Sequence, residues 1–463
     1  MREMTHAIFC EFLTNADDQV PGIVTRYREE YKRVGELLDS MPEVLEQAHN
    51  DIETMLNPEG KQGRKAVFSS DNLFRALVVM GIECLTFRET TIRIAESETL
   101  QNFCRLLKKS TVDYTLLCRA SCAISPQTWE KSNRFFGIRM MHEGKINPEI
   151  IRADTTVTEC NIHWPTDSSL LWDCYRVIER NITKIRQVLS MQELTSIRFH
   201  VKKIRKLHLD IARFAKSKCK KRQRKVIGWK KTLTRRVKQT VEKIVPVVKK
   251  LLNSPNLFAA AIGAELNEKL PAMARIVNVA ERNLAGEKVP ATEKILSIFE
   301  PHTELIMRGR REKPVEFGHA FLLAECPEKF ITDWLVFPQR PPDSTLIPVT
   351  LERHEETFGA KPKSAAFDMG FFPGADELES LRDDLDDEVE YLAVPSRLRD
   401  LGDALMSTYQ KFRAGIEGTI SCLKRAFRLS RCLFRGFNGF CRAIGCAVFC
   451  HNLIVMTPPP KPG

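Results

Sequence analysis

Three acidic residues stand out because of the residue types around them. Asp154 lies within a run of small and β-branched residues, 150–158, that is typical of a packed strand. Asp368 directly follows a short apolar run, and Glu417 lies within a helical pattern. A carboxylate in a buried strand costs free energy unless something pairs with it. Taken alone, Asp154 is more typical of a capping or turn aspartate, but the three acids together indicate a shared site.

Three carboxylates suit phosphoryl transfer with two divalent cations about 3.5–4 Å apart, and Mg²⁺ prefers such hard oxygen ligands. On a helix that turns about 100° per residue, Arg413 and Lys424 lie roughly 40° and 20° from Glu417, offset to the same side. We expect these two cations to face DNA phosphates beside the metals. An ordinary salt-bridged helix would explain Arg413 with Glu417 but would give Lys424 no particular role.

The elements that must position these residues can be read in chain order. A strand at 150–158 comes first, followed by a long helical stretch and a β-hairpin of 315–325 and 330–337. A helix capped at Asp343-Ser344 and stopped at Gly359 leads to the strand before Asp368. An acidic helix at 376–388, a strand at 391–394 and a helical segment from about 400 to 456 complete the order. Without the helical stretch, this is the order of the RNase H-like fold. In that fold the first and fourth strands are neighbours, and the last helix packs across them.

We therefore predict a mixed α/β (α+β) chain with an RNase H-like catalytic core. The expected domains are a helical N-terminal domain (1–145), a catalytic domain in two segments (146–172 and 314–456), a basic helical insertion (173–313) and a Pro-rich tail (457–463). In the N-terminal domain, Ser70 or Asp71 is expected to cap a helix, and two short helices follow. These helices suit a helix-turn-helix DNA-binding module carrying the cations Arg75, Arg88, Arg93, Arg105, Lys108 and Lys109. An all-helical packing domain is an equally good interpretation.

Basic residues are concentrated in one segment. The chain of 463 residues has a net charge of +12, but residues 175–250 alone hold 25 Lys and Arg against four acids, a net of +21, so the remainder carries −9. This asymmetry predicts a polyanion contact surface. Lys218, Lys220, Lys221 and Arg222 are the expected DNA contacts. The alternative is a solvated basic face, but such a face normally interleaves acids, and Lys216 to Lys238 contains none.

Composition places the chain among soluble proteins, with 43% hydrophobic and 28% charged residues. No apolar run reaches the roughly 18 residues of a membrane helix, and the start of the chain lacks a signal-peptide core, so we expect a cytosolic protein. Its 14 cysteines are then expected as thiols. The group Cys441, Cys446, Cys450 and His451 lacks the paired spacing of a zinc site. We expect His163 and His319 to be hydrogen-bonded structural residues.

These stretches resemble the DDE transposases of bacterial insertion sequences, particularly the ISNCY-type group. The likeness covers most of the chain from about residue 70 to 455. Its motifs are Ala153-Asp-Thr-Thr-Val and the segments 161–171, 297–306, 315–319, 331–333, 342–346 and 413–425. The resemblance implies a catalytic and metal-binding triad of Asp154, Asp368 and Glu417 with two Mg²⁺ or Mn²⁺ ions. It also implies the R-x3-E-x6-K part of the family signature on the last catalytic helix.

The resemblance further implies a DNA transposase that binds the terminal inverted repeats of its element, cuts the element ends and joins the 3′-OH to target DNA. Its partners would be double-stranded DNA and further copies of itself, in a dimer or larger synaptic complex on the cytoplasmic nucleoid. Two positions depart from the family pattern, Gln410 for the signature tyrosine and Met369 for an arginine. Two alternatives stay open: a domesticated DNA-binding protein with the same fold, and a metal-dependent nuclease without strand transfer.

Overall fold

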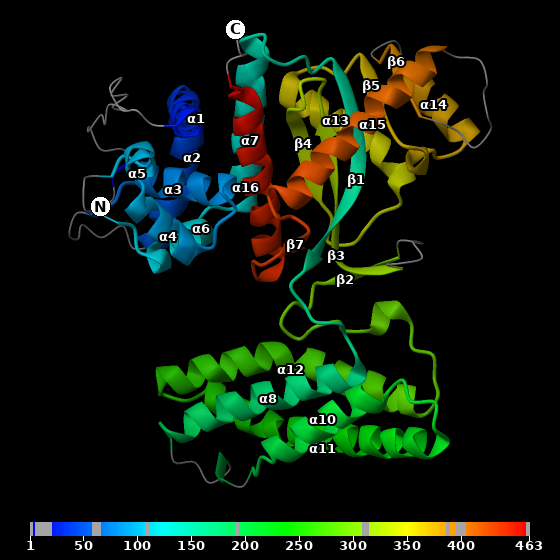
Figure 1. Ribbon diagram of the computed structural model, residues 1–463. Coiled ribbons are helices and arrows are strands. Elements are labelled where there is room, and N and C mark those ends of the chain that lie inside the picture. Colours follow the sequence, from blue (N-terminus) through cyan, green and yellow to red (C-terminus); the bar gives the residue numbers. More distant parts are fainter. Residues whose placement is uncertain are drawn as a thin grey trace. The chain divides into compact units, whose positions relative to one another are not determined.

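The computed structural model describes residues 3–4, 21–57, 66–106, 111–189, 194–195, 197–307, 314–385, 389–394 and 404–459 (Figure 1). The chain divides into two compact units. The first combines residues 1–160 and 318–463, and the second is 161–317. The insertion expected at 173–313 falls inside the second unit. The helices expected as a separate N-terminal domain belong to the same unit as most of the sheet.

The described residues form a mixed sheet of seven strands, most of which lie in the first unit, whereas the strand at 304–307 belongs to the second. Its strands are β1 (Ile150–Cys160), β2 (Glu304–Met307), β3 (Val315–Glu325), β4 (Ile331–Val336), β5 (Ser364–Ala366), β6 (Tyr391–Ala393) and β7 (Arg431–Cys432). The order is β2-β3-β1-β5-β6, with β4 also paired to β3 and β7 to β1. β3 runs antiparallel to β1 and β4, whereas β5 runs parallel to β1 and β6. The predicted hairpin of β3 and β4 and the pairing of the first strand with the strand before Asp368 are confirmed.

The central strands are covered on both faces. Ile151 and Ala153 on β1 and Leu323 on β3 are fully buried. The burial of β1 is interrupted at Asp154 and Thr155, which are only partly buried in mid-strand. A strand that is apolar on both faces needs helices on both sides of the sheet. A partly buried position within such a strand therefore marks a candidate functional site.

Helices of the first unit provide this cover. α15 (Ala404–Arg425) packs across β1, β5 and β6, whereas α7 (Pro126–His142), α13 (Leu346–Phe358) and α16 (Gly436–Met456) pack on β4 (Figure 1). Gly359 ends α13 in the left-handed conformation, as expected, with φ of 81°. The last helical segment is not continuous, because β7 separates α15 from α16. Two other elements of this region are the acidic helix α14 (Ala375–Leu385) and the short helical turn η2 (Asp343–Thr345).

The N-terminal helices are α1 (Gly22–Asp39), α2 (Pro42–Leu56), α3 (Ser70–Ile82), α4 (Phe87–Glu96), α5 (Glu98–Phe103) and α6 (Tyr114–Ala123). The expected cap of α3 was wrong, because Ser69 accepts the bond from Asn72 N in a full capping box. Asp71 instead pairs with Arg75, whose side chain is 4% exposed. Arg75 and Arg105 both also pair with Asp39, and Arg105 with Asp71. These two arginines therefore hold helices together rather than face DNA, while Lys108 and Lys109 lie outside the described residues.

Among the described helices, α16 alone is long and apolar enough to cross a membrane, and two thirds of it is buried in the protein. It packs against α3 and α7. Its polar residues serve the interior: Asn452 bonds to Ile331 N and O and to Asn133, and His451 bonds to Lys329 O. The contacts of a core helix thus account for the apolar composition of α16.

The second unit is mainly helical. Its helices are α8 (Asp167–Arg186), α10 (Val201–Phe214), α11 (Lys220–Leu252) and α12 (Leu257–Leu284). They pack side by side around a shared aliphatic core that includes Ile178, Leu233 and Ile244 (Figure 1). Near its two chain ends, the ring of Trp164 meets that of Phe317 edge-on, with centroids 5.0 Å apart. This contact brings the beginning and the end of the second unit together.

Candidate active site

The register of the parallel pair β1–β5 sets Asp154 beside Asp368. The last paired positions are Arg152 on β1 and Ala366 on β5. Asp154 and Asp368 each come two residues later, and residues two apart on a strand face the same side. Phe367, fully buried, continues the ladder by donating to Ala393 O at 2.9 Å. The two carboxylates therefore emerge together, at the carboxyl end of β5 and in the middle of β1.

A buried ion pair positions α15 against β1. Arg152 lies directly opposite Glu325 in the β1–β3 ladder, and the two side chains form a salt bridge that is 6% and 0% exposed. Arg152 Nη1 also donates to Phe412 O on α15 at 2.6 Å, and its guanidinium stacks over the Phe412 ring. Since Arg152 and Asp154 share a face of β1, this anchor places the next turn of α15 over Asp154.

Arg413 on that turn lies among the three predicted carboxylates. Its Nη1 is 3.4 Å from Asp154 Oδ2 and 3.8 Å from Asp368 Oδ1, and its Nη2 is 3.2 Å from Glu417 Oε1. The Asp154 and Asp368 oxygens are thus at most 7.2 Å apart, the sum of their distances to one atom. The structure therefore brings all three acids around one guanidinium, which is 13% exposed.

Exposure differs between the three acids. The side chain of Asp154 is 17% exposed, that of Asp368 49% and that of Glu417 66%. Burial raises the pKa of Asp154 to about 6, and the negative charges of Asp368 and Asp343 add to this. The N–H of Thr155, which donates to Asp154 Oδ1 at 2.7 Å, and the Arg413 guanidinium lower the pKa in part. The site thus holds more negative charge than its arginine compensates.

Asp343 is a fourth carboxylate that sequence reasoning assigned to a helix cap. That assignment was wrong: η2 and α13 have no side-chain cap bond. The Asp343 carboxylate accepts from Thr155 Oγ1 at 3.2 Å and pairs with Arg340 at 2.6 Å. It therefore lies beside the residue that follows Asp154. The one sequence feature that could have indicated this role for Asp343 is its place in the loop that follows β4.

The donor set fits hard divalent cations. Asp154, Asp343, Asp368 and Glu417 all carry carboxylates. The Arg413 guanidinium, which lies beside three of them, shows that the site attracts positive charge. Asp154, Asp368 and Glu417 do not belong to any set of described ligand atoms that all lie within 4.8 Å of one another.

The remaining predicted residues lie elsewhere. Lys424 is partly buried on α15, two turns or roughly 10 Å along the axis from Glu417. Lys218, Lys220, Lys221 and Arg222 are exposed residues of the second unit, at the beginning of α11. Arg222 lies over the ring of Phe214, 5.4 Å from its centroid.

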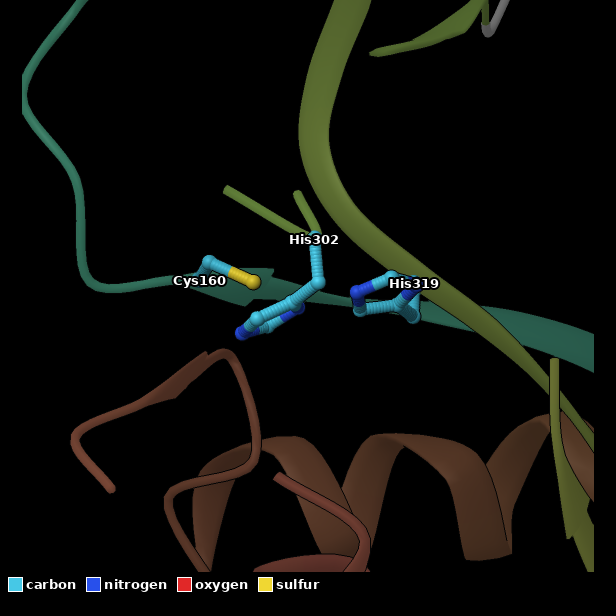
Figure 2. A group of neighbouring side chains, drawn as sticks. All are labelled: Cys160, His302 and His319. Atoms are coloured by element: carbon cyan, nitrogen blue, oxygen red, sulfur yellow. The ribbon is translucent and has the colours of Figure 1, made fainter. Parts of the chain in front are cut away.

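Both histidines have structural partners. His163 bonds to Asp173 at 2.6 Å, which raises the pKa of His163, and to Trp164 O. His319 is fully buried and bonds to Phe337 O at 3.1 Å. Figure 2 shows His319 on β3 with Cys160 at the end of β1 and His302. Because His302 belongs to the second unit, the first unit by itself offers two of these ligands, fewer than a catalytic zinc site uses.

The chain was also compared with known proteins. No protein-family model matches it, and no match was found among curated proteins or among solved structures. The function is therefore argued from the residues and geometry of the site alone.

Proposed function

We propose that this protein is a DNA transposase that cuts the ends of its element and joins the 3′-OH to target DNA. The observation that carries the proposal is the convergence of Asp154, Asp368 and Glu417 around Arg413. These residues come from a central strand, the end of its parallel neighbour and a crossing helix. Three carboxylates brought together in this way suit two-metal phosphoryl transfer.

The sheet supports an RNase H-like core as the finer description of the fold. Counting β1, β3, β4, β5 and β6 as strands one to five, their spatial order is 3-2-1-4-5, with only the second strand antiparallel to its neighbours. This agrees with the order of elements predicted from the sequence. In this description the second unit is an insertion between the first two strands.

Asp154, Asp368 and Glu417 would hold two Mg²⁺ or Mn²⁺ ions. When bound, such ions activate the attacking oxygen and stabilise the leaving oxygen of an in-line displacement. Asp154, held by the N–H of Thr155, keeps a fixed orientation toward the site. Arg413 lies beside the carboxylates that would hold these ions and, as a guanidinium, would pair with a phosphate of the DNA strand. Lys424, on the same side of α15, would extend that phosphate contact.

The expected partner is double-stranded DNA, bound as terminal repeats and as target, by a dimer or larger synaptic complex in the cytoplasm. In the second unit, the exposed group Lys218, Lys220, Lys221 and Arg222 supports a sequence-independent contact with the DNA backbone. In the first unit, three of the four described cations of the expected DNA-binding module, Arg75, Arg93 and Arg105, are engaged in ion pairs.

The test is Asp368→Asn in the full-length protein. Asn keeps the shape and the Oδ1 acceptor that caps the turn at Met369, but removes a negative ligand. Cleavage and joining of a DNA substrate with Mg²⁺ should be abolished, while DNA binding stays within about twofold. Asp376→Asn, at an exposed position on α14, is the matched control and should be fully active. If Asp368→Asn joined DNA as fast as the wild-type protein, the mechanism would be refuted. If the wild-type protein cut DNA but did not join it, the result would favour a nuclease.

A further inference from the structure

The cations of the second unit fall into two groups according to their partners. Lys238 on α11 reaches Glu281 on α12, with Nζ 2.9 and 3.1 Å from the two carboxylate oxygens. Arg198, Lys203, Arg236 and Lys243 lie toward α10 instead. Within the described residues, none of these four forms an ion pair with a carboxylate. Acids therefore lie among the cations on the α12 side of α11, whereas the four cations on the α10 side have no paired acid among the described residues.

These four cations border a groove of about 120 Å³ where α10 meets α11. No carboxylate lines it. Arg236, Thr240 and Lys243 follow one another at spacings of four and three residues, which place them on one face of α11. On the opposite wall, Lys203 lies next to Ile204, which is buried. The groove therefore has basic rims on both walls.

The floor of the groove is built from buried residues. Tyr175 is 3% exposed and Ile197 6%. The Tyr175 hydroxyl accepts a bond from His200 N at 2.7 Å, so its own proton remains to be donated. Burial raises the pKa of Tyr175 and the negative charge of Glu179 adds to this, whereas the bond from His200 N and the positive charge of Arg236 lower it, so Glu179 and Arg236 both lie near the hydroxyl. The groove thus offers a neutral donor at its base and charged donors around it.

We propose that the groove between α10 and α11 binds a phosphate group through Arg236, Lys203 and Lys243, with Tyr175 as a further donor. The cations that border the groove repel one another, and no carboxylate is among the lining residues, so the groove favours a multiply charged anion. Guanidinium and ammonium donors match phosphate oxygens. The volume exceeds that of a single water several times, enough for a tetrahedral anion. The phosphate belongs either to a nucleic-acid backbone or to a free phosphate compound. Binding of a nucleic-acid backbone rests on the proposed DNA function, whereas binding of a free phosphate compound does not.

The test compares Lys243→Gln with Lys238→Gln in the full-length protein. Both remove one lysine charge from α11, but Lys238 is partly buried and paired with Glu281, and only Lys243 borders the groove. The double variant Arg236→Gln/Lys243→Gln should lose at least about tenfold in affinity for pyrophosphate, measured by titration calorimetry. For duplex DNA of arbitrary sequence, it should flatten the slope of log K against log salt by about two units, since each phosphate contact contributes about 0.9. Lys238→Gln should match the wild type in both assays.

Loss of DNA binding identifies the backbone as the source of the phosphate, and loss of pyrophosphate binding alone identifies a free phosphate compound. If Lys243→Gln and the double variant match Lys238→Gln with both ligands, the groove is not a phosphate site. Circular dichroism melts of the same variants confirm folding. The cleavage assay of Asp368→Asn is separate, so failure of the transposase proposal leaves the pyrophosphate result interpretable.

Discussion

Gly415 on α15 faces the guanidinium of Arg152 on β1 so closely that a Cβ at position 415 would lie 2.1 Å from Arg152 Nη1. Arg152 has little freedom to withdraw, because it is paired with the fully buried Glu325 and bonded to Phe412 O. The absence of a side chain at one position thus allows α15 to lie against β1. The distance between Glu417 and the sheet depends on it.

Gly415→Ala should therefore destabilise the protein by roughly 2–4 kcal/mol, because either α15 moves outward or the buried ion pair is disturbed. Urea unfolding measures the change. Gly418→Ala is the matched control on the same helix, since a Cβ there would meet no atom within 4 Å. It should be neutral or stabilise by up to about 1 kcal/mol, as alanine favours helix over glycine. Equal effects of the two substitutions would contradict the close approach of α15.

Arg413→Gln should increase the affinity of the site for divalent cations severalfold. Arg413 is the cation that lies among the three acids in the metal-free protein, so ions must compete with its charge. Calorimetric titration with Mn²⁺ measures the affinity, and Lys424→Gln, two turns away, should leave it unchanged. DNA joining by Arg413→Gln should nevertheless fall, because a phosphate contact is lost. Weaker Mn²⁺ binding would mean that Arg413 organises the carboxylates instead of competing for them.

Asp154→Asn should stabilise the metal-free protein at pH 7 by about 1–3 kcal/mol. The pKa of Asp154 is raised to about 6 from 3.8, so between these values the folded protein binds more protons than the unfolded chain. Its contribution to stability is then favourable at low pH and is lost as the pH rises through 6. Chemical unfolding from pH 4 to 7.5 without metal should show this slope in the wild type and a flatter one in Asp154→Asn. If Asp154→Asn were less stable than the wild type at pH 7, the charged form of Asp154 would not be destabilised by its burial.

Asp343→Asn should lower the pKa of Asp154, because it removes one of the negative charges that raise this pKa. Deprotonation of Asp154 is needed for metal binding, so the pH at which Mn²⁺ binding sets in should fall. The change is measured by repeating the titration between pH 5 and 7. Asp384→Asn, at an exposed position of α14, is the control. An unchanged pH midpoint would show that Asp343 acts only on Thr155 and Arg340.

The parts of the site that sequence reasoning predicted are those with local signals. Asp154 and Asp368 interrupt apolar strand patterns, and Glu417 has Arg413 one turn before it. The pairing of β1 with β5 then followed from the order of elements, whereas its register did not. Asp343 was missed because an acid just before a helix has the ordinary appearance of a cap. Arg75 appeared free to bind DNA because one of its partners, Asp39, lies 36 residues away in the sequence.

The contact of Trp164 with Phe317 has a consequence for the order of folding. β1 and β3 pair side by side although the 154 residues from 161 to 314 separate them. Closing so long a loop as a random chain costs about 4 kcal/mol more than closing a two-residue turn. If the second unit folds first, its ends are already held together by these two rings, and the strands meet as in a short hairpin. Trp164→Ala should then slow the refolding of the sheet with little effect on its unfolding rate.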